Sequence, residues 1–397
     1  MAISLRVDGR DVSVADDGAS LLEVLRDRLG AHSPKDGCSP QGQCGCCTVL
    51  VDGQPRVACV TPARRVAGRT VTTLDGFPDD ERRAWAEAFT AAGASQCGFC
   101  TPGIVVRLAA LAASGGADVD TALLAHLCRC TGWLGVKEAF ARHRSPAPAA
   151  PRDLDAARRR ATLEGGAAQD VGPHVALGGG GFADDTAPAD ALVAVPDGRG
   201  GWAVAETLTE ARARAGKVQG RRTTLALSHP LAPPPGDWAL TLRTTWVEPA
   251  YLEPDASWCE PGGEPASPLA NGGAFGGKVA SVAPAAARRL ADEHGRAVRV
   301  LLSREDVVRT GPKRPPVAGG VRPDGSGVLR VARTPGVAAA VAAVAPDLAV
   351  EEVDVAGPPT SACVRAAGWA EAAVLVAAAR GGAAVAAPSG GRAEAEV

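Results

Sequence analysis

Cysteines are the residues whose type and spacing best predict chemistry in this chain. Nine of the eleven fall between Cys38 and Cys130, and the odd total argues against a framework built only of disulfides. Clustered cysteines in a cytosolic chain more often bind metal than form disulfides. The nine divide into two sets of four and one extra residue, Cys46, while the isolated Cys259 and Cys363 are interpreted as small buried thiols.

The first set has the spacing C-x5-C-x2-C-x11-C and consists of Cys38, Cys44, Cys47 and Cys59. The plant-type [2Fe–2S] pattern is C-x4-C-x2-C followed by a distant cysteine. A tight loop that wraps a cluster needs glycines to bend and to direct its amides at the sulfides, and this loop has Gly37, Gly42 and Gly45. Cys46 is interpreted as a non-ligand, although the alternative that it replaces Cys44 or Cys47 as a cluster ligand stays open. A zinc site with four thiolates is the less favoured alternative, because zinc sites usually carry two C-x2-C arms.

The second set combines C-x2-C with C-x-C, in the segments QCGFCTPG and LCRCTG, and consists of Cys97, Cys100, Cys128 and Cys130. Both pairs are expected at helix N-termini, where the helix dipole and free amides favour thiolates. This combination is unusual, and as a metal site it is a strong signal.

At these residues the chain resembles the molybdenum hydroxylases, the xanthine dehydrogenase/aldehyde oxidase family, over about residues 1–143. The resemblance rests on the order of the two sets and on the QCGFCTPG and CRCTG segments. It implies an oxidoreductase component with two [2Fe–2S] clusters that carry electrons from a molybdenum–pterin centre. Gln96 would then hydrogen-bond the pterin, and Cys130 would lie closest to it. It also implies molybdopterin-binding or FAD-binding partner subunits, with FAD as an electron acceptor.

Residues 271–278 of the second half spell NGGAFGGK. A nucleotide-binding P-loop would need Ser or Thr next, where Val279 stands, and a plain glycine-rich turn is the other alternative. The segment resembles the GGxFGGK loop of the family's molybdenum-binding subunit, which implies that molybdopterin is bound here by Gly273, Phe275 and Gly276. Residues 359–372 are similar to an arginine-containing segment near the metal, which implies that Arg365 lies there. Weaker similarities to the same subunit follow in order at 181–196, 202–218, 252–254 and 297–316.

The second half also departs from that subunit. It has only about 250 residues, the segment with the metal-neighbouring glutamine is missing between Glu253 and Gly272, and nothing matches the family's catalytic glutamate. A hydroxylase needs a base to activate the metal-bound hydroxide, so no catalytic residue is assigned and the chain is not expected to complete a molybdenum site alone. The resemblance implies a substrate that is an aldehyde, a purine or an N-heterocycle. The alternative function is a non-catalytic iron–sulfur redox carrier or sensor with a degenerate molybdenum domain.

The elements that must position the first set form a small sheet with one helix. Residues 3–14 predict a hairpin that turns at Asp8-Gly9. A helix begins at Ser20, whose capping box with Glu23 and apolar stripe carry it to Gly30. A second hairpin over 48–60 and a strand at 71–74 complete a unit that we expect to be a β-grasp ferredoxin-like domain.

Four helices must position the second set. Three of them are predicted at 79–91, 119–127 and 135–142. The fourth begins at Thr101, with Thr101 as its cap and Pro102 in its first turn. The Pro- and Ala-rich segment 143–151 is interpreted as a linker and is the clearest domain boundary in the sequence. Beyond it we expect a mixed α/β region, with helices at 203–218 and 284–294, strands at 238–246 and 297–303, an apolar helix or strand at 337–345, and a loose tail after 381. The fold class is α+β, and the expected domains are 1–78, 79–145, 146–230 and 231–397.

Composition excludes several other classes. The chain has 397 residues with 46% hydrophobic residues, so it is expected to fold into several domains. A net charge of -2 predicts no nucleic-acid partner. No apolar run reaches the roughly 20 residues of a membrane span, and the N-terminus alternates like a strand rather than a signal peptide, so we expect a cytoplasmic protein.

Overall fold

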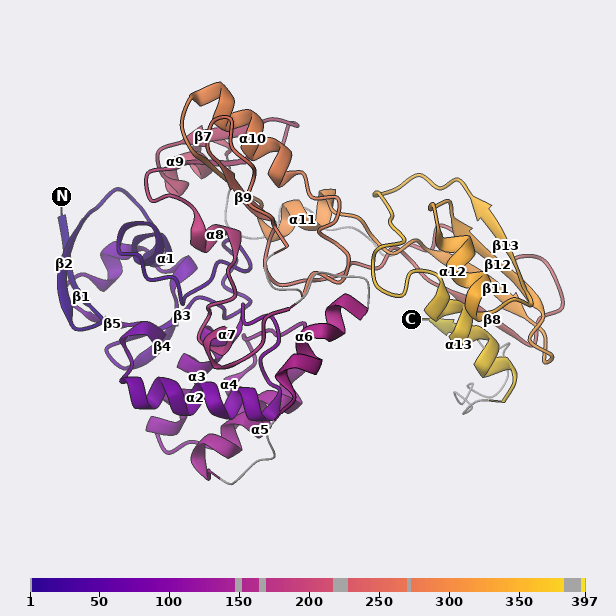
Figure 1. Ribbon diagram of the computed structural model, residues 1–397, viewed down its shortest axis with the longest axis horizontal. Helices are drawn as coiled ribbons and strands as arrows, with labels where there is room; N and C mark the ends of the chain where they lie inside the picture. The colour runs from indigo at the N-terminus through magenta and orange to yellow at the C-terminus, as the bar shows by residue number, and fades with distance from the viewer. Residues whose placement is uncertain are drawn as a thin grey trace. The chain divides into compact units, whose positions relative to one another are not determined.

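A computed structural model describes residues 2–146, 152–163, 169–216, 228–269, 273–381 and 394–396 (Figure 1). The chain forms two compact units. The first unit takes residues 1–222, 251–274 and 281–307, and the second takes 223–250, 275–280 and 308–397. The four consecutive domains expected from the sequence stay a prediction, since each compact unit is built from segments that are not contiguous in the chain.

The first sheet of the first unit has five strands in the order β2-β1-β5-β3-β4. Their bounds are β1 Ala2–Val7, β2 Arg10–Ala15, β3 Thr48–Val51, β4 Gln54–Val57 and β5 Thr70–Thr72. The predicted hairpin is confirmed, and its turn places Asp8 and Gly9 at φ values of 48° and 81°. The second hairpin is also confirmed, except that Ala58–Val60 forms a single 3-10 turn after β4. This turn holds Cys59.

The helix after Ser20 is confirmed, but the capping box is only half formed. Helix α1 (Leu21–Glu23) continues as a π-helical turn, Val24–Arg28, and the Ser20 hydroxyl accepts a hydrogen bond from the Glu23 amide over 3.2 Å. The Glu23 carboxylate does not return to Ser20. It accepts from the Thr209 hydroxyl over 2.6 Å, in the half of the chain beyond the linker. A long-range partner therefore displaces the local one that the pattern predicts.

The helical layer carries the second set of cysteines. Its helices are α2 (Asp79–Ala92), α3 (Thr101–Ala113), α4 (Val119–Ala122) and α5 (Gly132–Arg144), and they gather on one side of the first unit (Figure 1). Thr101 is the first helical residue rather than the cap, and its hydroxyl donates to Ser95 over 3.0 Å. The helix predicted at 119–127 is wrong beyond Ala122, because the chain turns there toward the first cysteine loop.

A second sheet in the first unit has four strands in the order β7-β6-β10-β9. They are β6 Leu192–Pro196, β7 Trp202–Ala205, β9 Ala256–Cys259 and β10 Val298–Leu301. Helices α8 (Ala183–Thr186), α9 (Leu208–Arg214) and α10 (Ala283–His294) pack beside it. The chain also forms α6 (Leu154–Leu163), α11 (Arg304–Thr310) and α7 (Pro173–Ala176), which packs on α2. The predictions at 284–294 and 297–303 are confirmed.

The single helix predicted at 203–218 is wrong at its start. Ala203 and Ala205 alternate into the core as part of β7, and the Thr207 hydroxyl then caps α9 by accepting from the Glu210 amide over 3.2 Å. Strand alternation and a cap therefore divide a segment whose composition favours helix throughout. Residues 217 and 218 lie outside the described residues.

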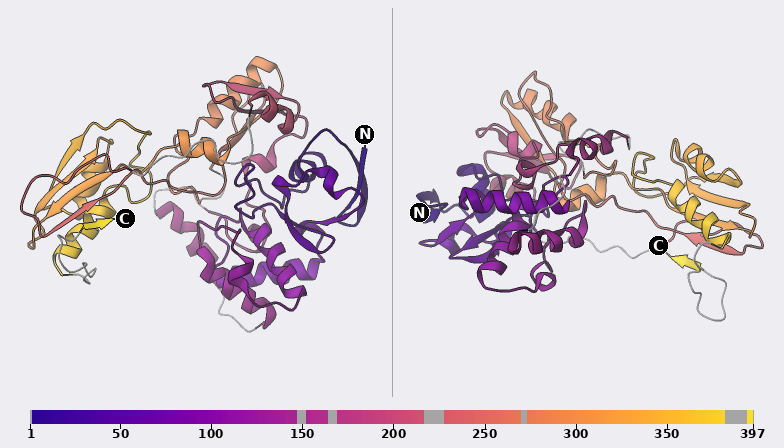
Figure 2. Two further views of the ribbon diagram at one scale, coloured as in Figure 1. Left: turned by 180° about the vertical axis from the view of Figure 1, so that it is seen from behind. Right: turned by 60° about the horizontal axis from the view of Figure 1, so that its bottom comes forward.

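The second unit is a five-stranded sheet in the order β13-β12-β11-β8-β14. Figure 2 shows its orange and yellow strands from two further sides. Its strands are β8 Leu240–Arg243, β11 Val317–Val321, β12 Gly327–Ala332, β13 Leu348–Val353 and β14 Glu394–Glu396. Two helices, α12 (Val337–Val344) and α13 (Trp369–Ala379), pack their apolar faces on it. The apolar segment 337–345 is thus a helix. Within the described part of the chain, no helix is both long and apolar enough to span a bilayer.

Candidate iron–sulfur centres

The first set of thiols converges from two places in the ferredoxin-like sheet. Three come from the loop before β3 and one from the turn after β4, and none is more than 5% exposed: Cys38, Cys44, Cys47 and Cys59. The Cys38 sulfur contacts those of Cys44 and Cys59, and Cys59 also contacts Cys47. The structure therefore brings all four sulfurs together.

Backbone amides point at these sulfurs. The Gln41 amide donates to Cys38 Sγ over 3.2 Å, and the Cys59 amide donates to Cys47 Sγ over 3.4 Å. Hydrogen bonds from Cys44 and Cys59, together with backbone amides, hold the pKa of Cys38 far below that of a free thiol, although burial opposes them. Because the thiolate is the form that binds metal, this environment favours Cys38 as a ligand.

Cys46 has different surroundings. It is fully buried, and its thiol donates to the Cys44 carbonyl over 3.8 Å. Burial raises the pKa of Cys46, so the neutral thiol is the favoured form. These contacts support the interpretation of Cys46 as a non-ligand.

The second set forms two pairs between the start of α3 and the segment before α5. The sulfurs of Cys97 and Cys130 are 3.5 Å apart, and Cys100 contacts Cys128. Thr131 supports Cys128 through its amide at 3.4 Å and its hydroxyl at 3.1 Å. The hydrogen bond from Cys100, and those from Thr131, lower the pKa of Cys128 to about 5 against the effect of burial.

The paired geometry fits a two-iron cluster. Within the described residues, no three His, Cys, Asp or Glu side chains are arranged around the position of one metal ion. A [2Fe–2S] cluster takes four cysteine thiolates, two on each iron, so the second set, whose thiols meet in pairs, suits it better than a single tetrahedral zinc ion. Loop amides that donate to the sulfurs belong to the same arrangement, since such hydrogen bonds tune cluster potentials.

Two hydrogen bonds join the two cysteine-bearing domains. Thr48 at the start of β3 contacts His126 Nε2 over 2.9 Å, and the Leu127 amide donates to the Cys44 carbonyl over 2.9 Å. Gly45 lies against the same segment, where a Cβ would come within 2.5 Å of the Ala125 carbonyl oxygen. The first cysteine loop and the segment that leads to Cys128 therefore pack directly on each other.

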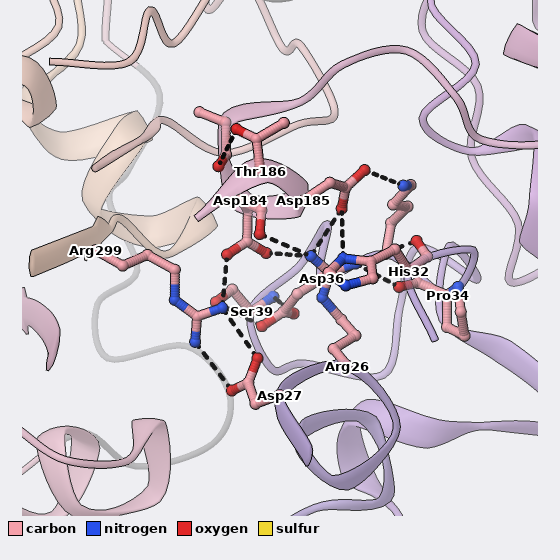
Figure 3. A network of polar contacts seen from close by, with 12 residues as sticks. Arg26, Asp27, His32, Pro34, Asp36, Ser39, Asp184, Asp185, Thr186 and Arg299 are labelled. Carbon is pink, nitrogen blue, oxygen red and sulfur yellow. Dashed lines mark hydrogen bonds and ion pairs between the residues drawn. The ribbon is translucent and has the colours of Figure 1, made fainter. Parts of the chain in front are cut away.

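A buried charged network adjoins the first cysteine loop (Figure 3). The Arg26 guanidinium lies between two carboxylates, at 2.7 Å from Asp184 and 2.8 Å from Asp185. Arg299 binds both oxygens of Asp27 over 2.9 and 3.0 Å and reaches Asp184 over 3.2 Å. These contacts fasten the half beyond the linker to the helix that begins at Ser20.

The charges in this network shift one another's titration. Burial would raise the pKa of Asp185, but the hydrogen bond with His32 and the charges of Arg26 and Lys35 hold it far below its usual range. The pKa of Asp184 is lowered in the same way by Arg26 and Arg299, against burial. Both carboxylates are therefore ionised at neutral pH. Nothing in the sequence predicted this network, because its only local signals are charged residues within an apolar helix.

Comparisons with known proteins agree with this geometry. Residues 73–141 match the [2Fe-2S] binding domain family. The chain is 35% identical to the nicotinate dehydrogenase small FeS subunit of Eubacterium barkeri, over 35% of this chain and 92% of that protein. It is 37% identical to the xanthine dehydrogenase iron-sulfur-binding subunit of Escherichia coli, over 29% of this chain and 76% of that protein. The chain belongs to the molybdenum hydroxylase family.

The fold likeness extends beyond the iron–sulfur domains of this molybdenum hydroxylase chain. The aldehyde oxidoreductase from Desulfovibrio gigas superposes with a TM-score of 0.65 at 19% identity, over 93% of this chain and 59% of that one. The likeness shows the fold alone at this identity. The α+β class, with its ferredoxin-like sheet, is confirmed.

The residues that the family resemblance assigns to molybdopterin lie in several places. The Gln96 amide donates to the Gln169 side chain over 2.9 Å. Gly273, in the first unit, lies against the second set of cysteines, where a Cβ would be 3.0 Å from Cys130 Sγ. Its neighbours 271 and 272 lie outside the described residues.

The other assigned residues lie together in the second unit. The Arg365 amide donates to the Phe275 carbonyl over 2.9 Å, and Gly276 packs directly on the Cys363 carbonyl, where no Cβ would fit. The glycine-rich segment and the arginine segment, matched separately in the sequence, are therefore neighbours. Cys363 itself is exposed, so its prediction as a buried thiol is wrong, whereas Cys259 is buried.

Proposed function

We propose that this chain transfers electrons through two [2Fe–2S] clusters as a component of a molybdenum hydroxylase. The observation that carries the proposal is the convergence of two separate groups of four thiols, the first group buried and the second buried or half-buried, in two segments that pack on each other. A [2Fe–2S] cluster accepts and returns one electron at a time. The chain's own residues bury the first group of sulfurs and direct backbone amides at sulfurs of both groups.

Electrons would enter from a molybdenum–pterin centre and leave to FAD on a partner subunit. Relatives named as small subunits support partners that bind molybdopterin and FAD. The substrate would be an aldehyde, a purine or an N-heterocycle, in line with the names of the aldehyde, xanthine and nicotinate enzymes among the relatives. We also propose that the protein is cytoplasmic.

Two cysteine variants test the cluster assignment. Wild-type protein purified without oxygen should carry iron and acid-labile sulfide for two clusters, with two distinct electron paramagnetic resonance signals. Cys59→Ser should remove one signal and Cys100→Ser the other, while Cys259→Ser, outside both sets, should keep both. Zinc in place of iron would contradict the proposal, and so would loss of the same signal in both variants.

We further propose that the glycine-rich segment and Arg365 contact molybdopterin. The residues would be Gly273, Phe275, Gly276 and Arg365, with Gln96 on the side of the second cluster. The close approach of Gly273 to Cys130 supports this, since a pterin beside that residue would lie next to the second cluster. Pterin analysis of the purified chain tests it, and stoichiometric pterin that is lost in Arg365→Ala is the expected result.

The contact of Gln96 favours a second candidate function. One of its two amide hydrogens already bonds Gln169 within the chain, which leaves one donor fewer for a pterin. A non-catalytic redox carrier or sensor with a degenerate molybdenum domain fits this contact. Intact clusters with no pterin, in the chain purified with its co-purifying subunits, would favour the carrier.

A further inference from the structure

Arg212 of helix α9 reaches the first cysteine loop from beyond the linker. One guanidinium nitrogen donates to Asp36 Oδ2 over 3.0 Å and to the Ser39 hydroxyl over 2.8 Å. Both ion-pair partners are well covered, the Arg212 side chain being 16% and the Asp36 side chain 14% exposed. Asp36 and Ser39 stand on either side of Cys38, so one arginine holds both flanks of a candidate ligand.

The loop at this point has an unfavourable backbone. Ser39 adopts a φ of 45°, in the left-handed region that few residues other than glycine occupy. It is one of the five residues between Cys38 and Cys44, where the plant-type pattern has four. The Asp36 carboxylate accepts from the Ser39 amide and hydroxyl, each over 3.1 Å. A strained turn of this kind persists only where its surroundings hold it. The hydrogen bonds from Arg212 to Asp36 and Ser39 are part of those surroundings.

A second contact from the same half of the chain fixes the start of this turn. The Lys35 ammonium is paired with Asp185 and donates to the Gly178 carbonyl over 3.1 Å. The Lys35 amide meanwhile donates to the Cys46 carbonyl over 3.0 Å, which ties the two ends of the loop together. The segment 35–39 is therefore held at both ends by residues that lie beyond position 150.

We propose that Arg212 is a positioning residue for the first cluster. It holds the turn from Asp36 to Ser39 so that Cys38 Sγ stays among the other thiols. It also places a positive charge beside a cluster that gains negative charge when it is reduced. The proposal rests on the proposed function, and it makes the half beyond the linker part of the first iron–sulfur site.

Arg212→Gln in the full-length chain tests the retention of the cluster. Hydrogen bonds to charged groups are strong enough that loss of the first cluster to a chelator should be about tenfold faster than in wild type, followed by its absorbance and paramagnetic signal. The second cluster should be lost at the wild-type rate. Arg214→Gln is the matched control, because Arg214 is exposed on the same helix and its guanidinium donates to the Val204 carbonyl of β7 instead of to the cysteine loop.

The reduction potential separates positioning from general stability. Net charge and hydrogen bonds set cluster potentials, so Arg212→Gln should make the first-cluster potential more negative and leave the second unchanged. Arg212→Lys keeps the charge but replaces the guanidinium nitrogen that makes both contacts with an ammonium on a shorter side chain. It should stay near the wild-type potential while still losing the cluster faster.

The outcomes distinguish the two proposals. Wild-type protein without two clusters would overturn the proposed function itself. Two clusters in wild type, with Arg212→Gln equal to wild type in both chelator loss and potential, would overturn only the role of Arg212. If Arg212→Gln does not fold, Ser39→Ala decides. It removes the hydroxyl that accepts from Arg212 and donates to Asp36, and an unchanged rate of first-cluster loss would then refute the proposal.

Discussion

Gly45 in the first cysteine loop has no room for a side chain. A Cβ there would lie 2.5 Å from the Ala125 carbonyl oxygen and 2.6 Å from His126 Cγ. Gly45→Ala is expected to lower the free energy of unfolding by about 1–3 kcal/mol for the forced contact, in addition to about 1–2 kcal/mol for the left-handed backbone. Urea denaturation and iron content measure both effects, and first-cluster iron should fall.

Gly53→Ala is the matched control for this prediction. Gly53 has nearly the same backbone, with a φ of 77° against 73° for Gly45, but nothing lies within 4 Å of its Cβ position. It should show only the backbone cost and keep its iron. Equal losses in the two variants would mean that the contact with the helical domain does not matter.

Asp185 makes the stability of the chain depend on pH. Its pKa is lower in the folded than in the unfolded chain, so its ion pairs contribute fully above the usual carboxylate value of about 3.9 and are lost as the pH falls below it. Asp185→Asn leaves Arg26 and Lys35 without this partner and should cost about 3 kcal/mol at pH 7. The difference from wild type should persist to about pH 5 and shrink below about pH 4, measured by urea denaturation.

Asp52→Asn provides the comparison for the Asp185 prediction. Asp52 also has a lowered pKa, but it pairs with Arg69 on the surface, with its side chain 46% exposed. Exposed pairs contribute little to stability, so its effect should be small at every pH. A loss in Asp185→Asn no larger than in Asp52→Asn would show that the buried network is not stabilising.

At the scale of elements, local sequence signals predicted most of the hairpins and helices that are stabilised by local interactions. The hairpin at Asp8-Gly9 and the helix over residues 283–294 follow from turn chemistry and amphipathic spacing, and both are present. The helix predicted at 203–218 failed, because alternate burial of small alanines in β7 cannot be distinguished from helix by composition. The Thr209 partner of Glu23 and the carboxylate partners of Arg26 lie more than 150 residues away, and no spacing within one chain specifies such pairs.

The segment from α7 to α8 illustrates an element held by distant contacts. Phe182 is 1% exposed and packs edge-to-face on Phe99, with ring centroids 5.1 Å apart. Phe99 stands between Cys97 and Cys100, so this contact supports the second set of thiols. Phe182→Ala should therefore cost about 3–5 kcal/mol and hasten loss of the second cluster.

Phe182→Leu distinguishes packing from ring geometry. It nearly conserves volume and should cost less than about 1.5 kcal/mol, apart from the roughly 0.5–1.5 kcal/mol of the aromatic pair. Thermal denaturation and the rate of second-cluster loss measure both variants. If alanine and leucine behave alike, the cavity is not what matters at this position.

At the scale of the whole molecule, the chain has separate hydrophobic cores. The core that contains all nine clustered cysteines is built from the iron–sulfur domains and is joined by Ala176 and Phe182. The core of the second unit gathers residues of β11, β12, α12 and α13 and contains no cysteine among its described members. Ligands that bind only the folded state stabilise the unit that holds them, so the clusters should act on the first unit.

Calorimetry of the chain with and without its clusters tests this separation. Two transitions are expected, since two compact units with their own cores can unfold independently. Removal of iron by a chelator should lower the melting temperature of one transition by several degrees or abolish it, because metal binding contributes directly to folding free energy. The other transition should keep its melting temperature. A single transition that shifts as a whole on iron removal would show that the two units unfold together, and that the second unit depends on the clusters for its stability.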